Sequence, residues 1–224
     1  EPATPTVPVY ALAAGDPVSL NVMEVVLVRD AGHMAAGQTA RDEMLASTSV
    51  YQRLLAQDLG LYFLIREYPD PVSLISSPDP VTANDLLDAF RTWKNGTLDT
   101  GSGFEPTAVF HSDRDWESDT TAGFSFVGVY GSQYAVTVLR RRSGYTDLPF
   151  STNLQIRNAA HQMGHVLGAN HLDIDDAAIM DPILHDTDPA DLFYLPDSIA
   201  AMEDSLDPLR PLQSIDAYAL AGAE

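Results

Sequence analysis

The stretch between His161 and His171 contains three histidines with the spacing of metal ligands. On a helix, His161 and His165 lie one turn apart with their imidazoles pointing the same way, as two ligands of one Zn²⁺ must. Gly168 can leave the helix in a left-handed conformation, so the returning chain can deliver His171 as a third ligand. Three protein ligands leave the fourth tetrahedral position to water, which is typical of a catalytic zinc site rather than a structural one.

The residue after the first histidine is Gln162, at a position where zinc hydrolases with the motif H-E-x-x-H carry a glutamate. That glutamate takes a proton from zinc-bound water and passes it to the leaving amine. An amide has nearly the same shape but no useful basicity, and loss of a general base costs on the order of 10²–10⁴ in rate. We therefore expect zinc binding with little turnover. The alternative interpretation is that the three histidines are ordinary members of a helix and a loop.

Residues 161–171 resemble the metzincin pattern H-E-x-x-H-x-x-G-x-x-H at every specified position except Gln162. Residues 178–182 resemble the Met-containing turn that lies beneath the metzincin zinc site, with Met180 as its methionine. A methionine in such a place also serves as ordinary core filling. The resemblance implies a zinc-dependent endopeptidase that hydrolyses peptide bonds of extended polypeptides.

Looser hydrophobic patterns resemble the adamalysin or reprolysin branch of the metzincins and occur in the order of that family. They lie at residues 22–30, 85–93, 110–116 and 122–128. The resemblance covers about residues 20–207 and implies an α/β (α+β) fold, a mixed twisted sheet with packed helices, and a zinc helix below the active-site cleft. The disulfide cysteines of the family are absent, because the chain has no cysteine.

The same resemblance implies two further sites. An extended substrate would lie against an edge strand as an added strand, held by backbone hydrogen bonds. The substrate-binding residues would then be Gly123, Phe124, Ser125 and Phe126. Some reprolysins bind calcium near the first strand, which makes Glu24 and Asp70 candidate Ca²⁺ ligands.

Composition limits the classes of partner. The 224 residues carry a net charge of −20, so the field of the protein repels nucleic acid and anionic membranes. No apolar run reaches the roughly 20 residues that span a membrane. Lys94 is the only lysine among 12 basic residues, a bias that we associate with bacteria. We expect a secreted, extracellular monomer whose partners are peptides or proteins, processed so that it starts at Glu1.

The elements that must position these residues follow from periodicity, caps and turn residues. We expect an N-terminal arm over residues 1–19, a catalytic domain over 20–207 and a tail or strap over 208–224. The predicted strands cover residues 20–29, 59–67, 72–75, 107–110, 124–130 and 135–139. The predicted helices cover residues 39–58, 82–94, 153–167 and 198–205, the second of them ended by Asn95-Gly96.

Several residues outside the motif could be over-interpreted. His33, His111 and His185 have no ligand spacing, and we expect no function for them. Residues 140–142 are a run of three arginines, which is usual for a solvated strand end or turn. Residues 173, 175 and 176 are aspartates without the pattern of a calcium loop, so a solvated acidic loop is expected.

Two hypotheses from different classes account for Gln162. In the first, the chain is a metalloendopeptidase in which glutamate was deliberately replaced by glutamine, which preserves the shape of the site and stops self-digestion. In the second, it is a natural pseudoprotease that binds zinc and peptide as an interaction module. We favour the first because every other motif position is intact, including Gly168 and Met180. Restoring glutamate at position 162 discriminates between them.

Overall fold

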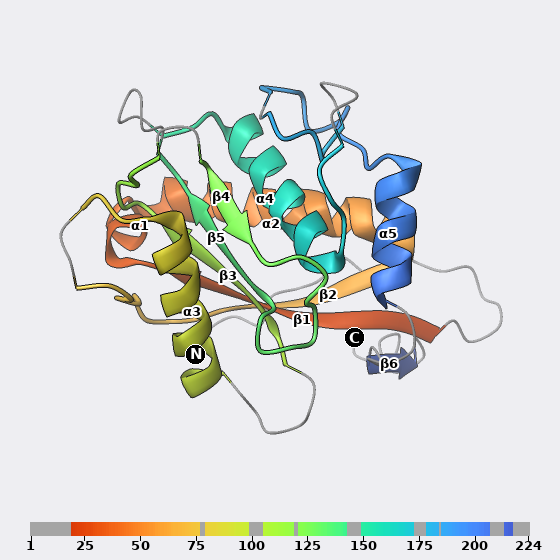
Figure 1. The fold of residues 1–224 in the computed structure, drawn as a ribbon, viewed down its shortest axis with the longest axis horizontal. Coiled ribbons are helices and arrows are strands. Elements are labelled where there is room, and N and C mark those ends of the chain that lie inside the picture. Colours follow the sequence, from red (N-terminus) through yellow and green to blue (C-terminus); the bar gives the residue numbers. More distant parts are fainter. Residues whose placement is uncertain are drawn as a thin grey trace.

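The computed structural model describes residues 19–76, 79–98, 105–118, 121–142, 149–172, 178–183, 185–206 and 213–216 (Figure 1). The predicted N-terminal arm over residues 1–19 lies, except for Ser19, outside the described residues. The same holds for the acidic stretch 173–177.

A single mixed sheet forms the centre of the molecule, with the strand order β2-β1-β3-β5-β4. Its strands are β1 (Ser19–Arg29), β2 (Leu61–Glu67), β3 (Thr107–Ser112), β4 (Gly123–Ser125), β5 (Val136–Arg140) and β6 (Gln213–Asp216). Strands β2, β1, β3 and β5 pair in parallel, and β4 is an antiparallel edge strand on β5. Strand β6 pairs antiparallel with the start of β1, so a strand from the segment expected as a tail or strap joins the sheet.

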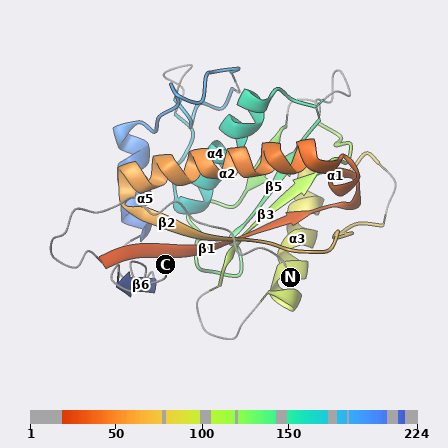
Figure 2. The same cartoon turned by 180° about the vertical axis from the view of Figure 1, so that it is seen from behind.

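Five helices accompany the sheet within the described residues: α1 (Ala31–Ala35), α2 (Gly37–Leu59), α3 (Ala83–Thr97), α4 (Thr152–Leu167) and α5 (Pro196–Leu206). Helices α2 and α3 lie on opposite sides of the sheet, as the two views show (Figures 1 and 2). Parallel strands with helices on both faces of the sheet are buried on both sides. Accordingly, every residue of β3 and of β5 is buried. The predicted mixed α/β fold with packed helices is confirmed.

Alternate residues of β1 enter two different cores. Met23, Val25 and Leu27 pack in a cluster with residues of α2 and α4. Val26 and Val28 point the other way and pack with residues of α3. The two-residue period of the strand thus ties the zinc-motif helix α4 to one face of the sheet.

Two predicted features of the first half are wrong. Residues 72–75 form no strand. Pro69 and Pro71 lack backbone donors, and Val72 contributes one hydrogen bond, from its N–H to the carbonyl of Arg29. Helix α3, capped as expected by Thr82, does not stop at Asn95 but continues to Thr97.

The predicted strand over residues 124–130 is also wrong beyond Ser125, where β4 ends. The next residues bend towards the end of α4 instead of continuing the sheet. The N–H of Gly128 donates to the carbonyl of His165 at 2.9 Å, and that of Val129 to the carbonyl of Val166 at 2.9 Å. These donors satisfy carbonyls that the last turn of a helix leaves free, so the loop caps the helix that carries the histidines.

The short helix α1 and strand β6 were not predicted from the sequence. Among the described residues, no helix combines the length and the apolar composition that crossing a membrane requires.

Candidate metal centre

Helix α4 presents the first two histidines of the motif. It begins after Ser151, whose side chain accepts a hydrogen bond from the backbone N–H of Leu154, and runs through both residues. It ends at Gly168, which has a φ of 114°. Only glycine adopts this conformation at little cost, and it turns the chain back so that His171 follows.

The three histidines meet at a single point. The Nε2 atoms of His161, His165 and His171 lie 3.1 Å from one another in each of the three pairs. A tetrahedral ion with Zn–N bonds of about 2.0–2.1 Å requires nitrogen atoms about 3.3–3.4 Å apart. The triad therefore has close to the dimensions of three ligands around one small ion, as the spacing in the sequence predicts.

The outer nitrogens of two histidines fix which tautomer they adopt. Nδ1 of His161 lies 2.7 Å from the carbonyl oxygen of Ile179, and Nδ1 of His165 lies 2.8 Å from that of Ala169. A carbonyl only accepts, so both Nδ1 atoms carry the proton and both Nε2 atoms turn lone pairs to the common point. Converging lone pairs repel unless a cation lies between them. The residues thus fit a metal, with backbone carbonyls orienting the ligands.

Burial keeps these ligands in the uncharged form that binds metal. Desolvation, followed by the charge of His165, lowers the pKa of His161 to about 3. Desolvation also lowers the pKa of His165. Imidazoles that stay neutral near pH 7 need no proton release before they bind a cation.

The Met-containing turn packs against α4 between the two helical histidines. Residues 178–181 form a turn closed by a hydrogen bond from the N–H of Asp181 to the carbonyl of Ala178. Met180 is buried, and a Cβ added at Gly164, between the two helical histidines, would lie 2.6 Å from its sulfur. The glycine is what allows this methionine to pack so close to the helix.

Gln162 is held between α4 and the edge strand β4. Its Oε1 accepts a hydrogen bond from the Ser125 hydroxyl at 2.7 Å. A Cβ added at Gly123 would lie 2.7 Å from its Cγ, so the strand backbone presses on the stem of the side chain. Two of the predicted substrate-binding residues therefore contact the side chain at the general-base position.

The other two predicted substrate-binding residues lie elsewhere. The side chain of Phe124 is 40% exposed on the edge strand. Phe126 follows the end of β4 and packs edge-on against Tyr134, with ring centres 5.3 Å apart. The Arg91 guanidinium lies over both rings. Strand β4 has one neighbour in the sheet order, so among the described strands its outer edge is open for an added strand.

Three buried residues that the sequence analysis did not identify support the site. Arg157, one turn before His161, donates from Nη2 to the carbonyl of Ala178 at 2.8 Å, which ties the Met-containing turn to α4. Tyr194 donates its hydroxyl proton to the carbonyl of Ala160 at 2.6 Å. Asn158 donates to the carbonyl of Ala122 at 2.9 Å, just before β4. For Arg157, the sequence offered one signal, an arginine on the apolar face of the helix predicted over residues 153–167.

The predicted calcium site finds no support. Glu24 makes a salt bridge with Arg66 on the neighbouring strand. Asp70 is exposed in a bend. Within the described ranges, the histidine triad is the one group of three or more side chains placed to hold a metal ion.

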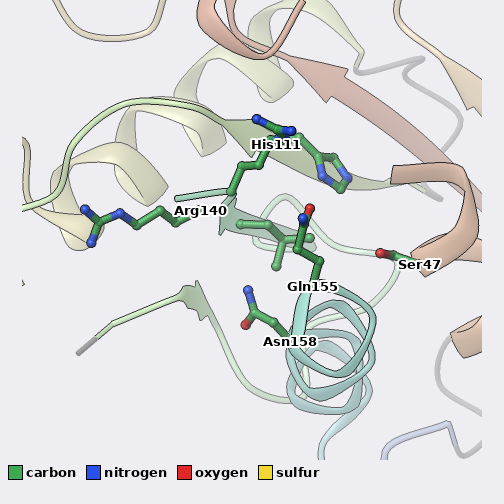
Figure 3. A pocket seen from close by; sticks show the side chains of 7 residues that line it. Ser47, His111, Arg140, Gln155 and Asn158 are labelled. Atoms are coloured by element: carbon green, nitrogen blue, oxygen red, sulfur yellow. The ribbon is translucent and has the colours of Figure 1, made fainter. Parts of the chain in front are cut away.

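A second polar cluster lies at the carboxyl ends of β1, β3 and β5, next to a pocket seen in Figure 3. The rings of His33 and His111, which the sequence predicted to be isolated, lie 5.5 Å apart there.

Arg140 and Arg141 are buried in the same cluster. Arg140 pairs with Asp115 at 2.6 Å, and Arg141 pairs with Glu43 at 2.9 Å. The expectation of a solvated arginine run is wrong for these two residues, because their acidic partners come from other segments. The remaining lining residues are Ser47, Leu139, Gln155 and Asn158.

This cluster makes stability depend on pH. Burial, followed by the charges of Arg141 and Arg29, lowers the pKa of His33 to about 4. The unfolded chain takes up the proton near pH 6.5, so the stability present above that pH is lost as the pH falls towards 4. We expect His33→Gln to reduce the loss in unfolding free energy between pH 7 and pH 5 by about 2 kcal/mol. Urea unfolding of both proteins at the two pH values checks this, and equal losses would contradict it.

Known proteins resemble this chain in sequence and in fold. The model of metallo-peptidase family M12B, reprolysin-like, matches residues 21–194. Metalloproteinase-II from Bacteroides fragilis has a similar fold, with a TM-score of 0.58 and 15% sequence identity over 83% of this chain. The match covers 53% of that structure, so this chain spans about half of its length. No curated protein matches. Because the family model covers most of the sequence, histidine triad included, the chain belongs to the reprolysin-like metallopeptidases of family M12B.

Proposed function

We propose that the chain carries a zinc endopeptidase site that binds extended peptides and, with Gln162 in place of the general base, hydrolyses them extremely slowly. The observation that carries this proposal is the meeting of three Nε2 atoms at 3.1 Å, two of them fixed as lone-pair donors by backbone carbonyls. Three neutral imidazoles are one of the donor sets found in catalytic zinc sites.

Each part of the site has its own role. Zinc, when bound, supplies a Lewis acid and lowers the pKa of its water. His161, His165 and His171 hold the metal, and the open edge of β4 aligns the backbone of an extended peptide. Gln162 occupies the place of the base, where its amide cannot take up the proton that peptide hydrolysis must remove from water.

A second candidate is a peptide-binding module that does not hydrolyse its ligand. The favouring observation is that a side chain without basicity occupies position 162 and is part of the packed structure, 6% exposed and hydrogen-bonded to the Ser125 hydroxyl at 2.7 Å. Both candidates bind the same metal and the same kind of peptide. They differ in whether the natural residue at position 162 is a glutamate that acts as a base. In either case we propose a secreted bacterial protein that acts as a monomer on peptides or proteins.

Metal binding tests the proposal directly. We expect one zinc ion per chain by calorimetry, and an affinity lower by more than about 100-fold in His165→Ala, since changes to residues that merely orient ligands already cost 10–100-fold. The matched control is His185→Ala, which removes a histidine outside the triad and should bind zinc as the parent does. A parent chain that binds no zinc would overturn the proposal.

A further inference from the structure

One buried arginine holds the Met-containing turn on the zinc-motif helix. Arg157 lies on α4 one turn before His161, and its side chain is completely buried. Its Nη2 donates to the carbonyl of Ala178 at 2.8 Å, and its Nη1 donates to the hydroxyl of Thr187 at 3.2 Å. A guanidinium has its N–H donors in a rigid planar fork, so one side chain fixes both acceptors relative to α4.

The peptide group between Ala178 and Ile179 is held at both of its polar atoms. Its carbonyl oxygen accepts from Arg157, and its N–H donates to the carbonyl of Phe193 at 3.0 Å. The two groups point in opposite directions from one rigid plane, so these bonds together fix its rotation. The next carbonyl along the chain, that of Ile179, accepts from Nδ1 of His161 at 2.7 Å. The direction of this carbonyl is therefore set one peptide group earlier, by Arg157 and Phe193.

The same turn supports the third histidine of the motif but not the second. The N–H of Leu172, which follows His171, donates to the carbonyl of Met180 at 3.0 Å. His165 is oriented elsewhere, by the carbonyl of Ala169 at 2.8 Å, just after the end of α4. A loosened turn should therefore disturb the first and third histidines, while the second keeps its partner.

Stability alone does not explain an arginine at this place. Moving a charge out of water is unfavourable, and an apolar side chain of similar volume in place of a buried charged one often leaves stability unchanged or raised. The chain has no cysteine, so a disulfide cannot hold the turn instead. An apolar side chain cannot bond to a chosen carbonyl in a chosen direction, whereas the guanidinium fork can. The property that explains the arginine is its control over the orientation of the turn.

We propose that Arg157 is a positioning residue of the metal centre, whose guanidinium orients the turn and, through the carbonyl of Ile179, the imidazole of His161. The inference rests on the proposed zinc site, and it assigns the aim of the first ligand to a residue outside the motif. Changes to groups that orient metal ligands typically cost 10–100-fold in affinity. We therefore expect Arg157→Met, which removes every donor, to bind one zinc ion roughly 10–100-fold more weakly than the parent.

The test observes the histidines one by one. Nitrogen-15 NMR of histidine-labelled protein shows which ring nitrogen carries the proton, before and after zinc is added. In Arg157→Met the Nδ1–H signal of His161 should shift and broaden, and that of His165 should stay as in the parent. A merely structural role would disturb both signals or neither.

The outcomes separate this inference from the proposed function. Parental zinc affinity together with parental histidine signals in Arg157→Met overturns the inference and leaves the zinc site standing. A parent chain that binds no zinc overturns the proposed function. In that case the spectra of the zinc-free chain still decide whether Arg157 positions His161.

Arg140→Met is the matched control. Arg140 is also buried and donates to a backbone carbonyl, that of Ser118 at 3.1 Å, but it lies on β5 and pairs with Asp115. The variant should keep the parental zinc affinity and both histidine signals. A loss of zinc affinity as large as that of Arg157→Met would overturn the inference, because it would follow from removing any buried arginine.

Arg157→Lys is the second variant, which decides the question if Arg157→Met does not fold. Lysine keeps the charge and much of the length, but a single ammonium cannot reproduce the planar fork that holds Ala178 and Thr187 together. Zinc affinity should therefore remain several-fold below that of the parent, with the His161 signal shifted. Parental affinity and parental signals in this variant would overturn the inference.

Discussion

Replacing Gln162 by glutamate raises the rate of peptide hydrolysis by the zinc-loaded chain by on the order of 10²–10⁴, the range that a positioned general base contributes. The substitution exchanges an amide nitrogen for an oxygen and leaves the packing unchanged. Gly123 still lies on the side-chain stem, and the Ser125 hydroxyl donates to a carboxylate oxygen as readily as to an amide oxygen. Cleavage of a library of internally quenched fluorescent peptides measures the gain.

The control for this experiment is Gln162→Ala, which removes the amide without supplying a base and should show no gain. Adding a chelator to Gln162→Glu should abolish its activity, and returning zinc should restore it. If Gln162→Glu binds one zinc ion and cuts no member of the library, the endopeptidase proposal fails and the binding-module candidate takes its place.

Replacing Gly168 by alanine should cost roughly 2–4 kcal/mol in unfolding free energy, combining a left-handed backbone penalty with overpacking. The residue has a φ of 114°, and a Cβ there would lie 2.7 Å from the Cβ of Ser205 and 3.1 Å from the carbonyl oxygen of Ala201. Both belong to α5, which therefore has to move. Because Ala169 orients His165, zinc affinity should also fall, on the order of tenfold.

The chain contains a matched control. Gly60 also has a positive φ, of 61°, but nothing lies within 4 Å of a Cβ placed on it. Gly60→Ala should therefore cost about 1 kcal/mol, the backbone contribution alone, with zinc affinity unchanged. Urea unfolding and zinc titration of both variants provide the measurement. Equal costs at the two positions would show that α5 does not pack against the end of α4 as the structure has it.

Local spacing explains what could be predicted. Two histidines four residues apart on a helix and a glycine that ends it bring three ligands together with little help from the rest of the chain, and the structure places the three Nε2 atoms at 3.1 Å. The apolar runs of β1, β3 and β5 and the cap at Thr82 are likewise properties of short segments. Their existence and type follow from the residues within them.

Contacts between residues far apart in the sequence explain why some predictions from the sequence were wrong. Residues 126–130 look like a strand, but the free carbonyls of α4 accept hydrogen bonds from Gly128 and Val129 and draw this loop off the sheet. Arg140 and Arg141 look solvated until Asp115 and Glu43 are placed beside them. No short stretch of sequence contains both partners of such a contact.

The sequence by itself determined the histidine triad, the missing base at position 162 and the alternation of strands and helices, because each depends on residues a few positions apart. Only the tertiary structure decided how Gln162 is held. Ser125 and Gly123 precede it by 37 and 39 positions, and they reach it because β4 pairs antiparallel with β5 against α4. The position of this side chain depends on contacts formed when separate elements pack together.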